Sequence, residues 1–241
     1  MIDSLYKIAP YIGSAASKHD LIKFIETIKT EYEIEMVLLQ ESVRKIDAKG
    51  KTVLIYDHSH SVQHALETLK TTGQDFNLLI AEQELGKTSD SITFAHELKI
   101  PYKVVPSYML SYLDETVDMA FFGAVTLQHG GQFVMDPGCK SVISHLHFEK
   151  KPIYIFLTTS KFSLWTIQSH QREIYVKSHM RKHYLTDIEF ERIKFSHDRV
   201  DLKLIDYTVT EKGIFTPAEL QKEYDRLKAI RDKEKKKRNL E

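Results

Sequence analysis

A regular alternation of short apolar runs with amphipathic segments limits the fold of this chain more than any other feature. The runs are rich in β-branched and aromatic residues, which is typical of strands buried on both faces of a parallel sheet. They cover residues 52–56, 76–81, 102–105, 117–122 and 153–157. Helical patterns separate them at residues 62–70, 88–99, 108–113 and 138–148. This order predicts the α/β class, with a Rossmann-like, doubly wound and mostly parallel sheet.

The segments on either side of this sheet have other patterns. Residues 17–48 lack Gly and Pro and carry apolar residues at helical spacing, with Ser17 or Asp20 as a candidate cap. We therefore expect an N-terminal helical segment (1–50), a Rossmann-like domain (51–217) and a C-terminal charged helix or tail (218–241). Thr216 is the expected N-cap of that last helix, with Pro at its first position and Glu at its third.

Two stretches late in the domain have weaker patterns. Residues 168–195 are polar and rich in His and Arg, and they predict either a short helix or an excursion from the domain. Residues 202–209 predict one more strand. The helix that follows ends in a run of Lys and Arg, which favours a solvated end over a contact with an acidic partner.

Composition excludes several classes of protein. The formal net charge of +0 argues against nucleic acid as the main partner, because phosphate binding usually requires a basic excess. The sequence contains no apolar run long enough to span a bilayer and does not begin with a signal-peptide pattern. The single cysteine, Cys139, excludes an intramolecular disulfide and a multi-cysteine zinc site. We therefore expect a cytoplasmic protein that contacts neither membrane nor nucleic acid.

Ligands of open parallel sheets bind beyond the carboxyl ends of the strands. Neither a Gly-x-Gly-x-x-Gly motif nor a Walker loop follows the first strand, which argues against ordinary dinucleotide and triphosphate cofactors. Ser59 and Ser61 lie at an expected helix N-terminus, which attracts anions, although plain N-capping explains them equally well. Glu82 follows the second strand, where an acid often meets a ribose hydroxyl, but a solvated carboxylate is the simpler interpretation.

The histidines and the cysteine suggest two further chemistries that we do not favour. His60 and His64 have the spacing of two metal ligands on one helix face, with His58 and Glu67 nearby, but solvent-facing histidines are more common. Cys139 and His145 fall on different faces of their expected helix, so a buried structural cysteine is preferred to a thiol–imidazole pair. We expect neither a metal nor a cofactor.

The segment 117–132, Val-Asp-Met-Ala-Phe-Phe-Gly-Ala-Val-Thr-Leu-Gln-His-Gly-Gly-Gln, resembles part of the translation initiation factor 2B alpha, beta and delta subunits. That family also includes methylthioribose-1-phosphate and ribose-1,5-bisphosphate isomerases. The resemblance continues through Gly138, Pro152 and the Thr-Ser-Lys-Phe run at 159–162. It also includes the Ser-rich loop at 57–61 and the closing segment 206–217. It therefore covers about residues 51–217 and implies the same Rossmann-like fold.

This chain departs from the family pattern at the positions that carry chemistry. In the isomerases a Gly-Ala-Asp carboxylate and an upstream Cys move the proton, and here the Asp position is Val125. An Asn-Lys pair becomes Met135-Asp136, which places a negative charge where a cation should meet phosphate. Such a charge opposes an anion by on the order of 1–4 kcal/mol at a few ångströms. The resemblance therefore implies a crevice without the expected catalytic residues.

Three functions remain open at this point. The first is a non-catalytic regulatory or assembly protein that pairs with itself or with homologous subunits, with a translation factor as a further possible partner. Its homodimer surface would include Phe133, Val134 and the helix 138–148. The second is a sensor of sugar phosphates or nucleotides, and the third is a divergent sugar-phosphate isomerase that recruits Asp57, Asp136 or a histidine as its base. No catalytic residue is assigned. The candidate ligand-binding residues are Asp57, His58, Ser59, Ser61, Glu82, Gly123, Val125, Gly138 and Lys161.

Overall fold

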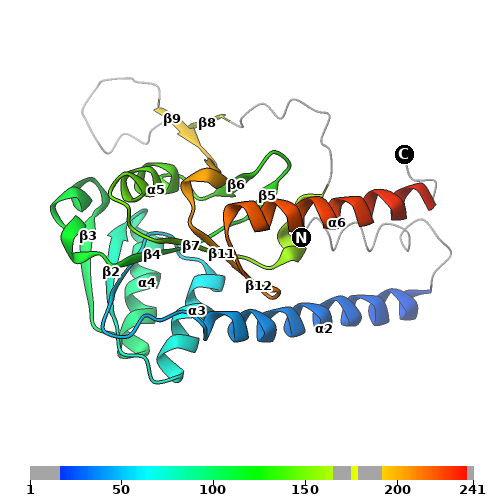
Figure 1. Ribbon diagram of the computed structural model, residues 1–241, viewed down its shortest axis with the longest axis horizontal. Coiled ribbons are helices and arrows are strands. Elements are labelled where there is room, and N and C mark those ends of the chain that lie inside the picture. Colours follow the sequence, from blue (N-terminus) through cyan, green and yellow to red (C-terminus); the bar gives the residue numbers. More distant parts are fainter. Residues whose placement is uncertain (1–16, 165–174, 179–191, 238–241) are drawn as a thin grey trace.

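The computed structural model describes residues 17–164, 175–178 and 192–237, and its centre is a seven-stranded sheet (Figure 1). Neighbouring strands run parallel, except that the edge strand β12 runs antiparallel to β11. In spatial order the strands are β12 (Gly213–Phe215), β11 (Tyr207–Thr210), β7 (Ile153–Phe156), β4 (Met119–Gly123), β1 (Thr52–Ile55), β2 (Asn77–Glu82) and β3 (Tyr102–Pro106). The expected doubly wound, mostly parallel sheet is confirmed.

Helices cover both faces of this sheet, because alternate strand residues point to opposite sides. Val53 and Ile55 of β1 face one core, and Leu54 between them faces the other. The first core receives side chains from α2 (Lys18–Val43), α3 (His60–Thr71) and α4 (Leu85–Glu97). The second receives them from the 3₁₀ helix η1 (Ser107–Tyr112), α5 (Cys139–Phe148) and α6 (Pro217–Lys237). Burial on both faces explains why the strands read as continuous apolar runs.

A second, three-stranded antiparallel sheet packs beside α5, and the sequence patterns did not predict it. Its order is β10 (Asp198–Asp201), β6 (Gln132–Met135) and β5 (Thr126–Gln128). Phe133 and Met135 of β6 are fully buried, whereas Gln132 and Val134 are only partly buried. Because this alternation buries Phe133 inside the monomer, the expectation that Phe133 lies on a dimer surface is wrong.

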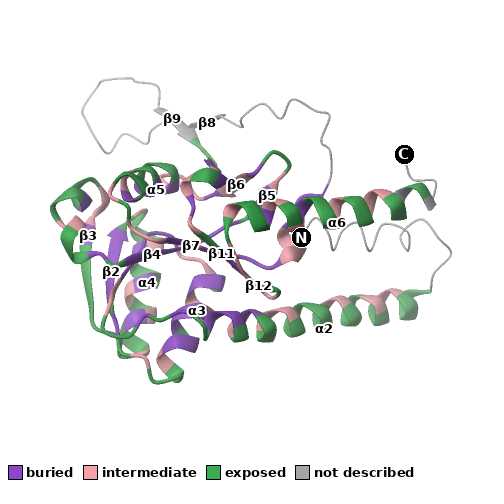
Figure 2. Cartoon of the chain, in the orientation of Figure 1, coloured by how far each residue is buried: buried purple, intermediate pink, exposed green. Residues whose placement is uncertain are grey.

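The two long helices, α2 and α6, extend away from the sheet (Figure 1). At the start of α2 the Ser17 hydroxyl accepts from the Asp20 N–H, and the Asp20 carboxylate accepts from the Ser17 N–H, so both expected caps are used. Only the last turns of α2 are buried, and Figure 2 shows the rest as mainly exposed. At the start of α6 the Glu219 carboxylate accepts from the N–H and hydroxyl of Thr216, as the capping motif predicts.

Several local expectations need correction. The strand expected at 202–209 is a 3₁₀ turn, η4 (Leu202–Leu204), followed by β11, and the short helix expected at 108–113 is the 3₁₀ helix η1. Of the stretch 168–195, the structure describes only β8 (Tyr175–Ser178) and β9 (Arg192–Phe195), which pair antiparallel. The remainder of that prediction lies outside the described residues. Among the described helices, none has the length and apolar character needed to cross a membrane.

Candidate functional site

The strand order reverses between β1 and β4, and the candidate site lies at this reversal. From β1 the chain passes through α3 to β2 on one side, whereas β4 lies on the other side of β1. In such a sheet a crevice opens at the carboxyl ends of the two strands. Asp57 and Ser59 follow β1 at this edge, and Gly123 is the last residue of β4.

Gly123 brings the two strand ends into close contact. Its backbone N–H donates to the Asp57 Oδ2 atom at 3.0 Å. A Cβ atom added to Gly123 would lie 1.9 Å from the Oγ atom of Ser59, a separation that no side chain tolerates. The glycine is therefore required here because of this close approach.

Asp57 is a buried acid with unused hydrogen-bonding capacity. Its residue surface is only 5% exposed, and its Oδ1 atom is buried without a hydrogen-bond partner. Burial raises the pKa of Asp57 to about 7, the bond from Gly123 opposes this rise, and the charge of Asp136 adds to it. The raised pKa favours the protonated form of this buried carboxyl group, which suits a group that exchanges a proton.

Lys161 comes to the same place from the loop after β7. Its Nζ atom lies 3.4 Å from the Ser61 hydroxyl in the first turn of α3. Burial lowers the pKa of Lys161, and the negative charge of Asp57 partly reverses this effect. The structure thus gathers five of the nine expected ligand-binding residues around the start of α3, which are Asp57, Ser59, Ser61, Gly123 and Lys161.

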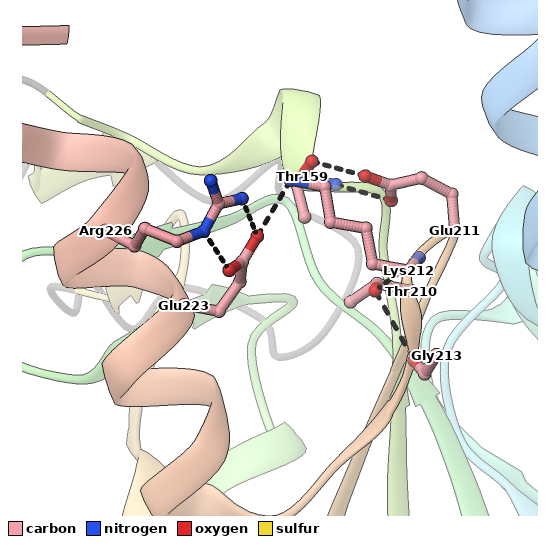
Figure 3. A network of polar contacts seen from close by, with 7 residues as sticks. All are labelled: Thr159, Thr210, Glu211, Lys212, Gly213, Glu223 and Arg226. Atoms are coloured by element: carbon pink, nitrogen blue, oxygen red, sulfur yellow. Dashed lines mark hydrogen bonds and ion pairs between the residues drawn. The ribbon is translucent and has the colours of Figure 1, made fainter. Parts of the chain in front are cut away.

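A network of polar contacts holds the loop that carries Lys161 (Figure 3). The N–H of Thr159 donates to Glu211 at 2.9 Å, and the Thr159 hydroxyl also contacts this carboxylate. The next residue, Ser160, donates its hydroxyl to Glu35 of α2 at 2.6 Å. Lys161 is thereby positioned by two distant elements, the β11–β12 turn and α2.

The same figure shows how α6 joins this region. Glu223 of α6 contacts Lys212 at 2.8 Å and accepts two hydrogen bonds from Arg226 at 2.7 Å each. The hydrogen bonds from Arg226 are the main cause that lowers the pKa of Glu223 to about 2. Lys212 also lies directly after Glu211, so the contacts of Glu223 tie α6 to the turn that holds Thr159.

Gly138 and the start of α5 form the second wall of the crevice. Gly138 has a φ of 94°, and a Cβ atom there would lie 1.9 Å from the Tyr56 hydroxyl oxygen. That hydroxyl donates to the Pro137 carbonyl at 3.0 Å, and the Gln83 side-chain amide donates to the same carbonyl at 3.3 Å. Asp136 forms an ion pair with Lys87. The negative charge expected to repel anions is therefore offset by a cation from α4.

Asp198 closes the N-terminus of α5, and no sequence pattern pointed to this residue. A single carboxylate oxygen of Asp198 accepts from the N–H groups of Gly138 and Lys140, at 2.9 Å each. These are the free backbone donors at which a helix N-terminus binds an anion. Because an internal carboxylate already occupies them, they are engaged in the folded chain. Asp198 is far from Gly138 in sequence, so spacing could not have revealed the contact.

The other expected ligand residues lie apart from this cluster. The Val125 side chain is 51% exposed, and its backbone N–H donates to the Val134 carbonyl at the base of the β5–β6 hairpin. The Nε2 atom of His58 lies 3.4 Å from the Nε2 atom of Gln63. The Nδ1 atom of His58 is buried without a hydrogen-bond partner. Glu82, at the end of β2, lines a neighbouring cavity of about 460 Å³. Glu82 therefore belongs to the neighbouring cavity, whereas Val125 lies on the hairpin, in neither space.

The alternative chemistries find little support. Within the described part of the chain no three His, Cys, Asp or Glu side chains form a group that could hold a metal. His64 instead contacts Glu67 at 3.8 Å. Cys139 is fully buried, and burial raises the pKa of its thiol, so the reactive thiolate is disfavoured. His145 contacts Asp114 at 2.7 Å, in keeping with separate structural roles for His145 and Cys139.

Known structures share this architecture. The translation initiation factor eIF-2B of Pyrococcus horikoshii OT3 superposes with a TM-score of 0.75 at 18% identity, covering 89% of this chain and 76% of that one. The tetrameric eIF2B-beta2-delta2 complex of Chaetomium thermophilum gives 0.67 at 16% identity, with 93% and 71% covered. The eIF2B beta subunit of the same organism gives 0.65 at 18%, with 86% and 57% covered. At such identities the likeness establishes the fold alone.

The family follows from a separate comparison. A search of curated protein sequences finds no match. A family model described as the initiation factor 2 subunit family matches residues 5–217, which is most of the sequence. This range includes both walls of the crevice and the loop of Lys161. The chain therefore belongs to the initiation factor 2 subunit family.

Proposed function

We propose that this chain is a non-catalytic, cytoplasmic member of its family that acts by associating with a second copy or with a homologous subunit. The observation that carries the proposal is the state of the crevice wall at α5. Asp198 occupies the backbone donors of that helix N-terminus, and Val125, which lies outside the wall on the β5–β6 hairpin, offers no exchangeable proton. Acid–base catalysis needs a positioned proton carrier, and tight anion binding needs free donors. This wall supplies neither.

Assembly is supported by the oligomeric state of a similar structure. One of the similar structures is a tetramer of beta and delta subunits. The most exposed apolar side chain of the previously expected dimer surface is Phe148, at 80%, since Phe133 is buried. A larger apolar surface lies on α2. We call it the α2 apolar surface, and its members, each 45–57% exposed, are Ile34, Val37 and Leu38.

The α2 apolar surface is the interface that we assign to a second copy or a homologous subunit. Ile34, Val37 and Leu38 have the spacing of neighbours on one helix face. Monomeric soluble proteins seldom leave a large contiguous apolar patch in water, and such patches commonly mark interaction sites. Covering these side chains would remove this unfavourable exposure.

Light scattering at micromolar concentration tests the proposal. We expect a dimer or larger assembly for the natural chain, and a monomer for the double substitution Ile34→Asp and Val37→Asp, because two carboxylates would be buried at the interface. Tyr112→Asp is a matched control, since Tyr112 is 82% exposed on η1 and should not alter assembly. A natural chain that stays monomeric, and that also captures no homologous subunit from its native host, would refute the proposal.

A second function is favoured by one specific observation, the state of Asp57. This acid has a free buried oxygen and a pKa raised by burial to about 7, and Lys161 stands near it. A proton carrier beside a cation is what a divergent sugar-phosphate isomerase would need to move a proton between adjacent carbons. A sensor that binds a sugar phosphate or a nucleotide without reacting would use the same residues.

Turnover and binding measurements separate these possibilities. A panel of aldose phosphates should give ketose products only if Asp57 acts as the base, and Asp57→Asn should then abolish turnover while keeping the shape of the side chain. Calorimetric binding without turnover would favour the sensor. Absence of both across the panel would remove the crevice from consideration and leave assembly as the function.

A further inference from the structure

The cavity next to the crevice shares Tyr56 and Pro137 with the crevice's second wall, and its other walls have no role in the proposed function. It measures about 460 Å³, within the usual range of small-molecule pockets, roughly 300–1,000 Å³. Three of its lining residues come from consecutive carboxyl ends of the sheet: Tyr56 after β1, Glu82 at the end of β2 and Ser107 after β3. Phe195 of β9 also lines it. Residues distant in sequence are thus brought around one open pocket.

We propose that this cavity binds a ribonucleoside that carries no phosphate group. The inference goes beyond the proposed role in assembly and does not depend on it. It rests on three features of the lining: an acid at the end of β2, an aromatic ring on the facing segment and an excess of negative charge.

Glu82 supplies the contact to the ribose. In doubly wound sheets, an acid just beyond the second strand accepts hydrogen bonds from ribose hydroxyls. Glu82 is the last residue of β2, is exposed and lines the cavity. An ionised carboxylate has two acceptor oxygens, which match the two neighbouring hydroxyl groups of a ribose. This pairing requires the 2′-hydroxyl and so distinguishes a ribonucleoside from a deoxyribonucleoside.

Phe195 supplies a surface for the base. Its side chain is 43% exposed and lines the cavity, together with the apolar Pro137. Aromatic side chains stack on any nucleobase, since every base presents a flat π-face. Stacking of this kind gives affinity with little selectivity among bases. The ribose contact is therefore the main determinant of specificity.

The charge of the lining disfavours a phosphate. Glu82 borders the cavity, and Lys87, the lysine among its described lining residues, is already paired with Asp136. The first loop also lacks the glycine-rich turn that holds a pyrophosphate. Coulomb repulsion should therefore make a nucleotide bind more weakly than its nucleoside.

Asp198 positions the aromatic wall. It follows Phe195 and Ser196 closely in sequence and is fixed by the N–H groups of Gly138 and Lys140 at the start of α5. Ser196 lines the cavity as well. The contact that closes the anion site of α5 thus also sets where the base would stack. Asp198 is a positioning residue for the cavity.

Calorimetry and ligand-observed NMR with the full chain test the proposal, with adenosine, 2′-deoxyadenosine and AMP as probes. Adenosine should bind. 2′-Deoxyadenosine and AMP should each bind at least about tenfold more weakly than adenosine. Glu82→Gln should weaken adenosine about tenfold and 2′-deoxyadenosine by less, because the deoxynucleoside has only the 3′-hydroxyl contact to lose. Phe195→Ala should weaken both nucleosides equally.

Glu97→Gln is the matched control, the same chemical change at an exposed position near the opposite end of α4, and it should leave adenosine binding unchanged. Several results would overturn the proposal. These are no adenosine binding up to millimolar concentration, equal binding of adenosine and 2′-deoxyadenosine, or tighter binding of AMP. Binding of N-acetyl-arginine amide in competition with adenosine would also overturn it, because the acids would then form a site for a basic peptide side chain.

Discussion

Two helices, α3 and α5, begin at the same edge of the sheet, yet their N-termini are in opposite states. At α3 the N-cap Ser59 makes no side-chain capping bond. At α5 the Asp198 carboxylate accepts from the N–H groups of Gly138 and Lys140. Both ends attract negative charge through their free donors and the helix dipole. The backbone architecture is shared, and a side chain from a distant segment decides which end stays open.

The charged residues beside the two helix ends show the same contrast between an open end and a satisfied end. Next to α3 lie Lys161, whose burial lowers its pKa, and Asp57, whose burial raises its pKa to about 7. Next to α5 the charges are already paired, as Asp136 with Lys87. The α3 end retains groups that can respond to a ligand or to pH, whereas the α5 end is satisfied within the chain. The difference locates any surviving chemistry at α3.

The largest expected effect is the dependence of stability on pH that Asp57 causes. Its pKa is near the ordinary value of 3.8 in the unfolded chain and about 7 in the native protein. The native state therefore holds an extra proton between these values, and the free energy of unfolding falls as pH rises through that window. The fall is at most on the order of 4 kcal/mol. Asp57→Asn should remove it, as measured by urea unfolding at about pH 5 and about pH 8.

Asp75→Asn is the matched control for that experiment, because Asp75 is an exposed acid whose pKa is lowered by its hydrogen bond with Lys70. The control should keep the loss of stability toward higher pH. If Asp57→Asn also keeps the full loss, Asp57 is not the buried acid that distinguishes the α3 end.

A smaller effect is expected where β4 meets the α3 end. Gly123→Ala places a methyl group 1.9 Å from Ser59 Oγ, which forces the loop to move. Overpacking of this kind typically costs about 1–3 kcal/mol, as denaturant unfolding would measure. Gly86→Ala, in the first turn of α4, is the control, since nothing lies within 4 Å of its added Cβ and its φ is not positive. Equal costs for both substitutions would contradict the close contact at Gly123.

The smallest effects compare the two helix ends directly. Asp198→Ala should lower the free energy of unfolding by about 1–2 kcal/mol, because it leaves two N–H donors of α5 without their acceptor. Asp198→Asn should cost less, because the amide retains an acceptor oxygen. Ser59→Ala should change stability by less than about 0.5 kcal/mol, as its hydroxyl caps nothing. Equal losses of stability for Asp198→Ala and Ser59→Ala would contradict the claim that only the N-terminus of α5 is capped by a side chain.

Prediction from sequence succeeded where structure is local. The apolar runs identified β1, β2, β3, β4 and β7, and the capping patterns identified the starts of α2 and α6. The patterns failed for the β5–β6 hairpin and for β10, whose short strands pair across a long separation in sequence. The same separation hid Asp198. Asp57 and Lys161 were selected from their places after strands, but their burial was not visible in the sequence.

The sequence by itself determined the doubly wound sheet, because periodicity, β-branched runs and turn residues are written into neighbouring positions. It also determined that position 125 is a valine without an exchangeable proton. Only the tertiary structure decided which helix N-terminus is closed, which acid is buried and which cation meets it. Those outcomes depend on contacts such as Asp198 with Gly138 and Lys87 with Asp136. Such contacts form only after the sheet has brought distant residues together, so their energies belong to the fold and not to any local segment.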